Sequence, residues 1–160
     1  MHPASSRIGI PLAVNRGVTG AIWVTDREPG IRTLFGELIA DAEVLDPAEL
    51  EGRLAIGLRP DALVIDGTQF LSLSARLRRD LQALPRLLIC TGVALGSLPM
   101  ELVTGPGVAI LGKPFCIEDL EAAVEWLRDG MAADDSAGAP VATLVQRRRP
   151  RTVRRRTPAR

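Results

Sequence analysis

The amino-acid sequence predicts an α/β protein with a doubly wound parallel β-sheet, covered by helices on both faces. Short apolar runs typical of buried strands alternate five times with segments of helical periodicity. Aromatic residues make up only 3% of the chain, so Leu, Ile, Val and Ala must build the core. At 160 residues the chain can hold one domain with additional terminal segments. Parallel strands need crossover connections, so five consecutive βα units leave few other topologies.

The first two units begin with an apolar run that ends in an acid. "GAIWVTD" (20–26) has the pattern of a buried strand. Residues 29–42 carry apolar side chains at helical spacing, and we expect a helix there. A short strand is expected at 42–46, followed by a helix over 47–59 that ends before Pro60.

The third and fourth units follow the same pattern. "DALVIDG" (61–67) is a second apolar run that ends in an acid and predicts another buried strand. "RLLICTG" (86–92) predicts a strand that ends in a hydroxyl group and a glycine, and 97–105 a short helix of weak pattern. Between the two strands a single helix is predicted over 70–85, because four leucines share one helical face: Leu73, Leu77, Leu81 and Leu84.

The fifth unit contains the only lysine of the chain. "GVAILGKP" (107–114) predicts a strand with Lys113 at its end, whereas the other nineteen cationic residues are arginine. A final helix is expected over 116–130, closed by Gly130.

Polar side chains follow four of the five predicted strands. Because the carboxyl ends of parallel strands meet at one edge of a sheet, we expect these side chains to lie together where such sheets bind ligands. They are an acidic cluster with one arginine after the first strand, a lone acid, a hydroxyl group and the lysine: Asp26, Arg27, Glu28, Asp66, Thr91 and Lys113.

The formal net charge of +1 conceals an asymmetry along the chain. The last fifteen residues contain eight arginines and no acid, so the preceding 145 residues carry 12 basic and 19 acidic side chains, a charge of −7. We therefore expect an N-terminal extension (1–19), one folded domain (20–130), a small polar linker (131–145) and a basic disordered tail (146–160).

The cysteines and the apolar runs indicate the cellular compartment of the protein. Cys90 and Cys116 lack metal-ligand spacing and indicate a reducing environment. No run approaches the roughly 18 uncharged apolar residues of a spanning helix, and the N-terminus lacks a secretory signal pattern. The sequence thus favours a soluble cytoplasmic protein that does not bind a membrane.

The four strand-end motifs together resemble the receiver domain of bacterial two-component response regulators. "VTDREPGIR", "PDALVIDG", "LLICTG" and "LGKPF" occur in the order and at the strand ends of that family, over about residues 20–130. The resemblance implies a flavodoxin-like fold with strand order 2-1-3-4-5. It also implies a cis peptide bond before Pro114.

The resemblance also implies roles for the strand-end residues. Asp66 would accept a phosphoryl group from a histidine kinase or phosphotransfer protein, Thr91 would be the switch hydroxyl, and Lys113 would pair with the carboxylate and then with the phosphoryl group. Lysine suits this because its ammonium is compact and its stem is flexible, whereas arginine carries a wider rigid fork. A Mg²⁺ ion would neutralise the developing charge, held by Asp26, Asp66, the backbone carbonyl of Thr68 and in one interpretation Glu28.

The sequence departs from the family at the acidic pocket. Arg27 stands where the second acid, the usual direct Mg²⁺ ligand, is expected. Three interpretations remain open. Arg27 points to solvent while Glu28 becomes the ligand, or Arg27 reaches Asp66 and replaces the metal, or the pocket is degenerate. The usual aromatic switch residue of the fifth strand is Ile110 here, so its readout would differ.

Two classes of function follow from these observations. The first is a stand-alone atypical response regulator that is phosphorylated on Asp66, signals by protein–protein contact and is not an enzyme beyond self-catalysed phosphotransfer. The alternative is a nonphosphorylatable pseudo-receiver scaffold, or an adaptor that uses the basic tail on nucleic acid. FMN binding is disfavoured because "TDREPG" is acidic where a phosphate loop would be rich in glycine and hydroxyl groups.

The ends of the chain and the final helix bear on its partners. "RIGIPLAV" (7–14) alternates like a strand for which the fold has no position; it would cap the sheet edge, pair with 140–145, exchange between subunits or remain disordered. We expect a homodimer, formed through these segments or through the face of 96–105 with the final helix, using Leu98, Met100, Leu102 and Val103.

Overall fold

The computed structural model describes residues 21–93, 97–103 and 105–132, and it confirms the predicted fold class. Its sheet has five strands, all parallel, in the order β2-β1-β3-β4-β5. The strands are β1 Ile22–Val24, β2 Ala42–Val44, β3 Ala62–Asp66, β4 Arg86–Thr91 and β5 Val108–Gly112. The helices are α1 Pro29–Leu38, α2 Pro47–Ala55, α3 Gly67–Ser72, α4 Ala75–Gln82, α5 Met100–Val103 and α6 Ile117–Ala132.

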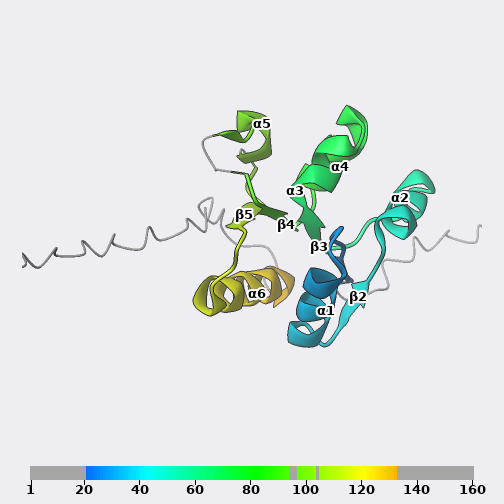
Figure 1. Ribbon diagram of the computed structural model, residues 1–160. Helices are drawn as coiled ribbons and strands as arrows, with labels where there is room; N and C mark the ends of the chain where they lie inside the picture. The colour runs from blue at the N-terminus through cyan, green and yellow to red at the C-terminus, as the bar shows by residue number, and fades with distance from the viewer. Residues whose placement is uncertain (1–20, 94–96, 104, 133–160) are drawn as a thin grey trace, which may run out of the picture.

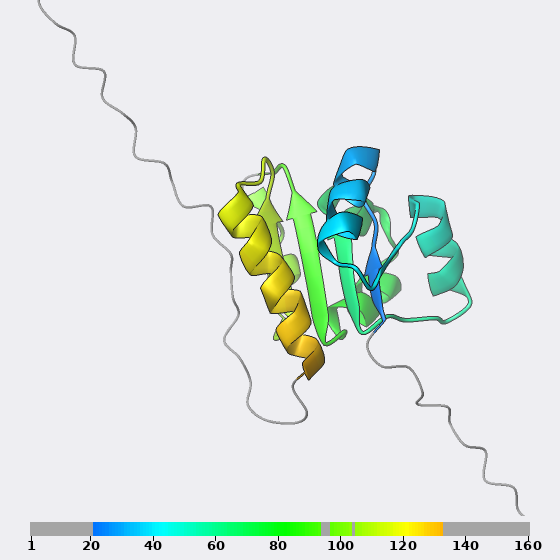
Figure 2. The ribbon, with the colours of Figure 1, turned by 90° about the horizontal axis from the view of Figure 1, so that it is seen from below.

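Helices cover both faces of the sheet, as the apolar strands predict. In Figure 1, α1 and α6 lie on one side of the sheet and α2, α3, α4 and α5 on the other; Figure 2 shows α1 and α6 packed across the strands. Alternate residues of each strand enter the two cores, so Trp23 packs on the α2 side while Ile22 and Val24 pack on the α1 side. β1, β3, β4 and β5 are therefore buried on both faces, whereas the edge strand β2 is largely exposed.

The helix predicted over 70–85 is two helices. α3 begins directly after Asp66 and ends at Ser72, and α4 begins at Ala75. The Ser74 side chain accepts a hydrogen bond from the Leu77 backbone N–H at 3.3 Å and so caps the second helix. The leucine spacing survives the break, and for this reason the periodicity alone did not reveal it.

Other predicted helix ends also move. α1 ends at Leu38, four residues before the predicted end at 42, and α5 spans only Met100–Val103 of the predicted 97–105. α2 ends at Ala55, and Gly57 follows in the left-handed conformation (φ 87°), which only glycine adopts freely. α6 continues through Gly130 to Ala132, so the predicted linker begins two residues later than the helix pattern indicated.

Several sequence predictions fall on segments outside the described residues. These are the N-terminal extension with its 7–14 strand pattern, most of the linker and the basic tail. Over the described ranges, no helix has both the length and the apolar character to cross a membrane.

Candidate functional site

The carboxyl edge of the sheet brings together four of the predicted site residues. Asp26 follows β1, Asp66 is the last residue of β3, Thr91 ends β4 and Lys113 follows β5. The Lys113 backbone N–H donates to the Thr91 carbonyl at 2.7 Å, which extends the β4–β5 pairing to the lysine itself. The peptide bond between Lys113 and Pro114 is cis, as the resemblance implied.

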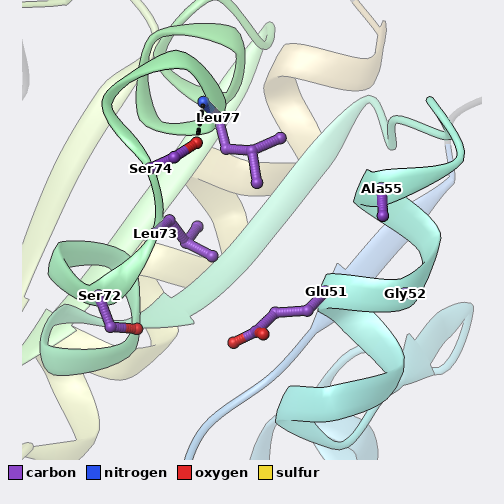
Figure 3. A pocket seen from close by; sticks show the side chains of 7 residues that line it. All are labelled: Glu51, Gly52, Ala55, Ser72, Leu73, Ser74 and Leu77. Atoms are coloured by element: carbon purple, nitrogen blue, oxygen red, sulfur yellow. Dashed lines mark hydrogen bonds between the residues drawn. The ribbon is translucent and has the colours of Figure 1, made fainter.

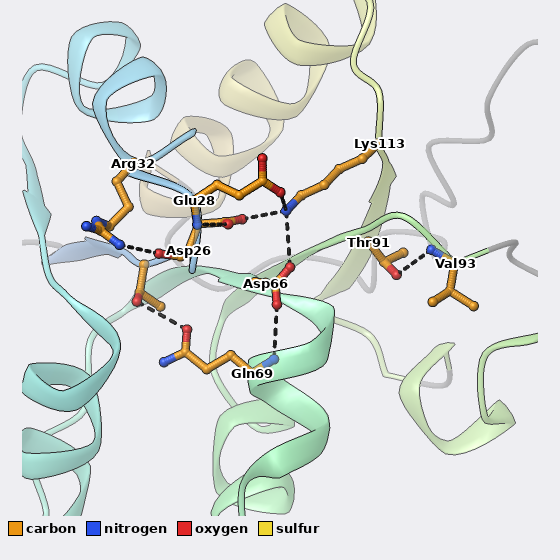
Figure 4. Close-up of polar contacts among 9 residues, drawn as sticks. Asp26, Glu28, Arg32, Asp66, Gln69, Thr91, Val93 and Lys113 are labelled. Atoms are coloured by element: carbon orange, nitrogen blue, oxygen red, sulfur yellow. Dashed lines mark hydrogen bonds and ion pairs between the residues drawn. The ribbon is translucent and has the colours of Figure 1, made fainter. Parts of the chain in front are cut away.

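The centre of the site is the ammonium group of Lys113 (Figure 4). It donates to Asp26 Oδ2 at 2.9 Å, to Asp66 Oδ1 at 3.1 Å and to Glu28 Oε1 at 3.3 Å. The Asp26 and Asp66 side chains are largely buried, with 2% and 11% of their surface exposed, whereas Glu28 is 66% exposed. One cation therefore neutralises part of the charge of three carboxylates, two of which have little access to water.

The carboxylates hold Lys113 in its charged form. Partial burial acts to lower the pKa of Lys113, but the hydrogen bonds and charges of Asp26 and Asp66 outweigh it. The pKa consequently lies above the usual lysine value. Lys113 therefore remains protonated at neutral pH.

Asp66 also caps the helix that follows it. Its Oδ2 accepts the backbone N–H of Gln69 at 3.1 Å, while its Oδ1 accepts from Lys113. The Gln69 side chain is buried and turns toward β1, where its Oε1 accepts from the Thr25 hydroxyl at 3.3 Å. Its Nε2 donates to the Pro47 carbonyl at 3.5 Å. The orientation of the Asp66 carboxylate is therefore fixed from two sides.

Asp26 is oriented by a turn in its own segment. Its Oδ1 accepts the Glu28 backbone N–H at 2.9 Å, an Asx-turn with Arg27 at the apex. The guanidinium of Arg32, on the first turns of α1, donates to the Asp26 carbonyl at 2.6 Å. The turn leaves Asp26 Oδ2 directed to Lys113.

The Arg27 side chain does not reach the carboxylates. It is exposed, and among the described residues it forms no ion pair. The interpretation in which Arg27 contacts Asp66 is therefore wrong, because the Asx-turn presents the residue at its apex to solvent. The solvent-facing Arg27 agrees with the first interpretation, but Glu28 contacts Lys113 rather than a metal ion. The second cation near Asp26 is Arg32.

Thr91 lies close to the residue that follows Asp66. A Cβ atom added to Gly67 would lie 3.0 Å from Thr91 Cβ and 3.1 Å from its Oγ1. The hydroxyl oxygen accepts the Val93 backbone N–H at 3.1 Å, which leaves its hydrogen free to donate. The missing side chain of Gly67 therefore lets Thr91 pack closely against the residue that follows Asp66.

The carboxylates are donors of the kind that Mg²⁺ prefers, but their arrangement does not form a metal site. Within the described ranges, no three His, Cys, Asp or Glu side chains are grouped to hold a metal ion, and Lys113 lies between Asp26 and Asp66. Thr68 belongs to the first turn of α3, where helix carbonyls point toward the C-terminal end and away from Asp66. The arrangement thus disfavours the magnesium ligands that the resemblance implied.

The predicted switch and interface residues lie elsewhere. Ile110 is 3% exposed in the core on the α2 side of the sheet, paired with Ile89 of β4. Leu98, which we expected on an interface, is 8% exposed in the same core, whereas Met100 is 73% exposed.

Gln69 and Arg32 are the residues of the site that the sequence reasoning missed. Asp66 and Gln69 have the spacing of a capping box, an N-cap acid followed three residues later by Gln, which is a readable signal. Arg32 offers no comparable signal, because its contact is to a backbone carbonyl.

A pocket between α2 and the α3–α4 connection is a weaker candidate (Figure 3). Glu51 is the single ionisable residue of its lining, which otherwise consists of small and apolar residues: Gly52, Ala55, Ser72, Leu73, Ser74 and Leu77. One carboxylate without a partner does not provide acid–base or nucleophilic chemistry. The carboxyl edge therefore remains the candidate site.

Comparison with known proteins does not assign the chain to a family. No protein-family model matches the sequence, and no curated protein matches it either. The chemistry of the site is therefore inferred from its own contacts.

Proposed function

We propose that this chain is an atypical stand-alone receiver protein that accepts a phosphoryl group on Asp66. One observation carries the proposal: Lys113 joins the carboxylate at the end of the central strand to a second buried carboxylate, 2.9 and 3.1 Å away. Such a pair costs desolvation energy that a purely structural role does not require. It does place a mobile cation beside a potential nucleophile.

In the proposed reaction an Asp66 oxygen attacks the phosphorus of a phosphohistidine on the donor protein. An O–P bond forms, the donor N–P bond breaks, and the electron pair leaves with the imidazole, which takes up a proton. Lys113 follows the negative charge from Asp66 to a phosphoryl oxygen, and the Thr91 hydroxyl donates to another. The residues do not fit a metal as they are arranged, so no step is assigned to one.

The test is phosphorylation of the full chain by a small phosphodonor, followed by intact-mass measurement with and without Mg²⁺. We expect one added phosphoryl group, absent in Asp66→Asn. Asp46→Asn is the matched control, because Asp46, like Asp66, is the N-cap of the helix that follows it and accepts the Glu49 backbone N–H at 2.9 Å. Asparagine keeps the cap at both positions. An unmodified wild-type mass under both conditions would refute phosphorylation.

A second function is favoured by the occupancy of Asp66. Both of its oxygens already accept hydrogen bonds, one from Lys113 and one from the α3 cap. This arrangement also suits a nonphosphorylatable scaffold in which the ion pair fixes the sheet edge. In that case the mass stays unchanged, and Asp66→Asn lowers stability without loss of any modification.

A further inference from the structure

A groove runs between the end of α1 and the second half of α6, on the face of the sheet opposite α2. Its floor is apolar, formed by Leu38 and Val124, and acids from consecutive turns of α6 dominate its rim. The lining consists of Leu38, Glu121, Val124, Glu125, Arg128 and Asp129. Its volume is about 420 Å³, enough for several side chains of a bound segment.

The rim acids have no cationic partner within the described part of the chain. Glu121, Glu125 and Asp129 are exposed and recur every four residues, so they form one stripe along the helix. Arg128 donates instead to the Leu38 carbonyl at 3.0 Å, and it forms no ion pair with the stripe. Like charges at this spacing destabilise a helix unless a cation covers them.

The C-terminal end of the chain carries the opposite charge to the acidic stripe. Residues 146–160 contain eight arginines and no acid. The described helix ends at Ala132, three residues after Asp129, so the connection to this segment begins beside the groove. The thirteen connecting residues, 133–145, can reach at most about 3.3 Å each, which in total far exceeds the roughly 12 Å of helix between Glu121 and Asp129.

We propose that the arginine-rich segment 146–160 docks in the α1–α6 groove of its own chain. Guanidinium groups pair with the stripe in bidentate fashion, and the arginine stems cover Leu38 and Val124. Single exposed pairs are weak, but the short tether raises the local concentration to about the millimolar range, where several weak pairs suffice. This inference does not depend on phosphorylation of Asp66.

The test uses a spin label on the full chain and amide NMR signals. Val153→Cys places the label between the arginine groups, in a Cys116→Ser background; Cys90 is fully buried and stays unlabelled. At low salt we expect selective broadening of the signals from 121–129 and from the end of α1. The broadening should decline severalfold at about 0.5 M salt, where the screening length falls to a few ångströms.

Two double variants with the same charge change make the test specific. Glu121→Gln with Glu125→Gln should remove most of the broadening, whereas Glu51→Gln with Glu101→Gln, on other helices, should leave it. Equal effects of the two pairs, or broadening centred on another surface, would overturn the proposal. A mixture of spin-labelled chain without isotope enrichment and isotope-enriched chain without spin label shows broadening only if the segment docks on a second copy. Broadening of equal strength in that mixture would overturn docking within one chain.

Discussion

The Lys113 ammonium lies 3.1 Å from Asp66 Oδ1, although 47 positions separate the two residues in the chain. The parallel sheet brings them together, because β3 and β5 both end at the same edge and flank β4. The same ammonium also contacts Asp26 after β1, so it links three strand ends. The stability of this edge should therefore depend on the charge of one side chain.

Replacing Lys113 by Met should lower the free energy of unfolding by about 2 kcal/mol at neutral pH, because two buried carboxylates lose their cation. The pKa of Lys113 is raised in the folded state, so its contribution is fully present below the usual lysine value of 10.5. It is lost as pH rises through the higher folded-state pKa. Denaturant unfolding of wild type and variant between pH 7 and strongly alkaline pH measures the difference. A difference that already vanishes near pH 8 would contradict the charge assignment.

The sequence predicted this edge well because its chemistry depends on topology. Once five βα units are recognised, Asp26, Asp66 and Lys113 must converge whatever their rotamers are. The direction of the Arg27 side chain could not be predicted from the sequence. It depends on whether the Asp26 side chain accepts a hydrogen bond from the Glu28 backbone N–H. The division between α3 and α4 was hidden for a similar reason. The Ser74 cap interrupts the helix without disturbing the spacing of its leucines.

Arg27 should contribute little to folding. Its side chain is exposed and without an ion pair in the described structure, so Arg27→Ala should change the free energy of unfolding by less than about 0.5 kcal/mol. Arg32→Ala is the contrasting variant, because it removes the 2.6 Å bond to the Asp26 carbonyl and should cost about 1–2 kcal/mol. Thermal denaturation of both variants makes the comparison. A larger loss of stability for Arg27→Ala would show that the Arg27 side chain takes part in the contacts of the site.

Gln69 and Thr25 should behave as a coupled pair. Gln69→Leu leaves the fully buried Thr25 hydroxyl without its acceptor, at a cost of about 1–3 kcal/mol. Adding Thr25→Val removes the stranded hydroxyl, so the double variant should be more stable than Gln69→Leu alone. A double-mutant cycle by denaturant unfolding measures the coupling. Strictly additive effects would show that the 3.3 Å contact contributes nothing.

The predicted homodimer can be tested at its proposed face. α5 and α6 flank the edge strand β5 (Figure 1), and Ile117, the first residue of α6, is 56% exposed. Ile117→Glu should weaken self-association, whereas Ile56→Glu, at the end of α2 and 76% exposed, should not. Sedimentation velocity at tens of micromolar, about the range of weak homodimers, gives the measurement. Deletion of residues 1–18 tests dimerisation through the terminal segments. If this deletion abolishes the dimer and Ile117→Glu does not, the N-terminal segment forms the interface.

Gly67→Ala should disturb the contact between β3 and β4 at the site. The new methyl group would lie 3.0 Å from Thr91 Cβ and 3.1 Å from its Oγ1, which forces the hydroxyl to move. Overpacking of this kind costs about 1–3 kcal/mol, which exceeds the gain of roughly 1 kcal/mol that alanine brings to a helix. Gly52→Ala in α2 is the matched control, since no atom lies within 4 Å of its added Cβ. That variant should therefore be stabilised, while Gly67→Ala is destabilised and accepts less phosphoryl label. If both alanines stabilise the fold alike, Thr91 does not pack against the residue after Asp66.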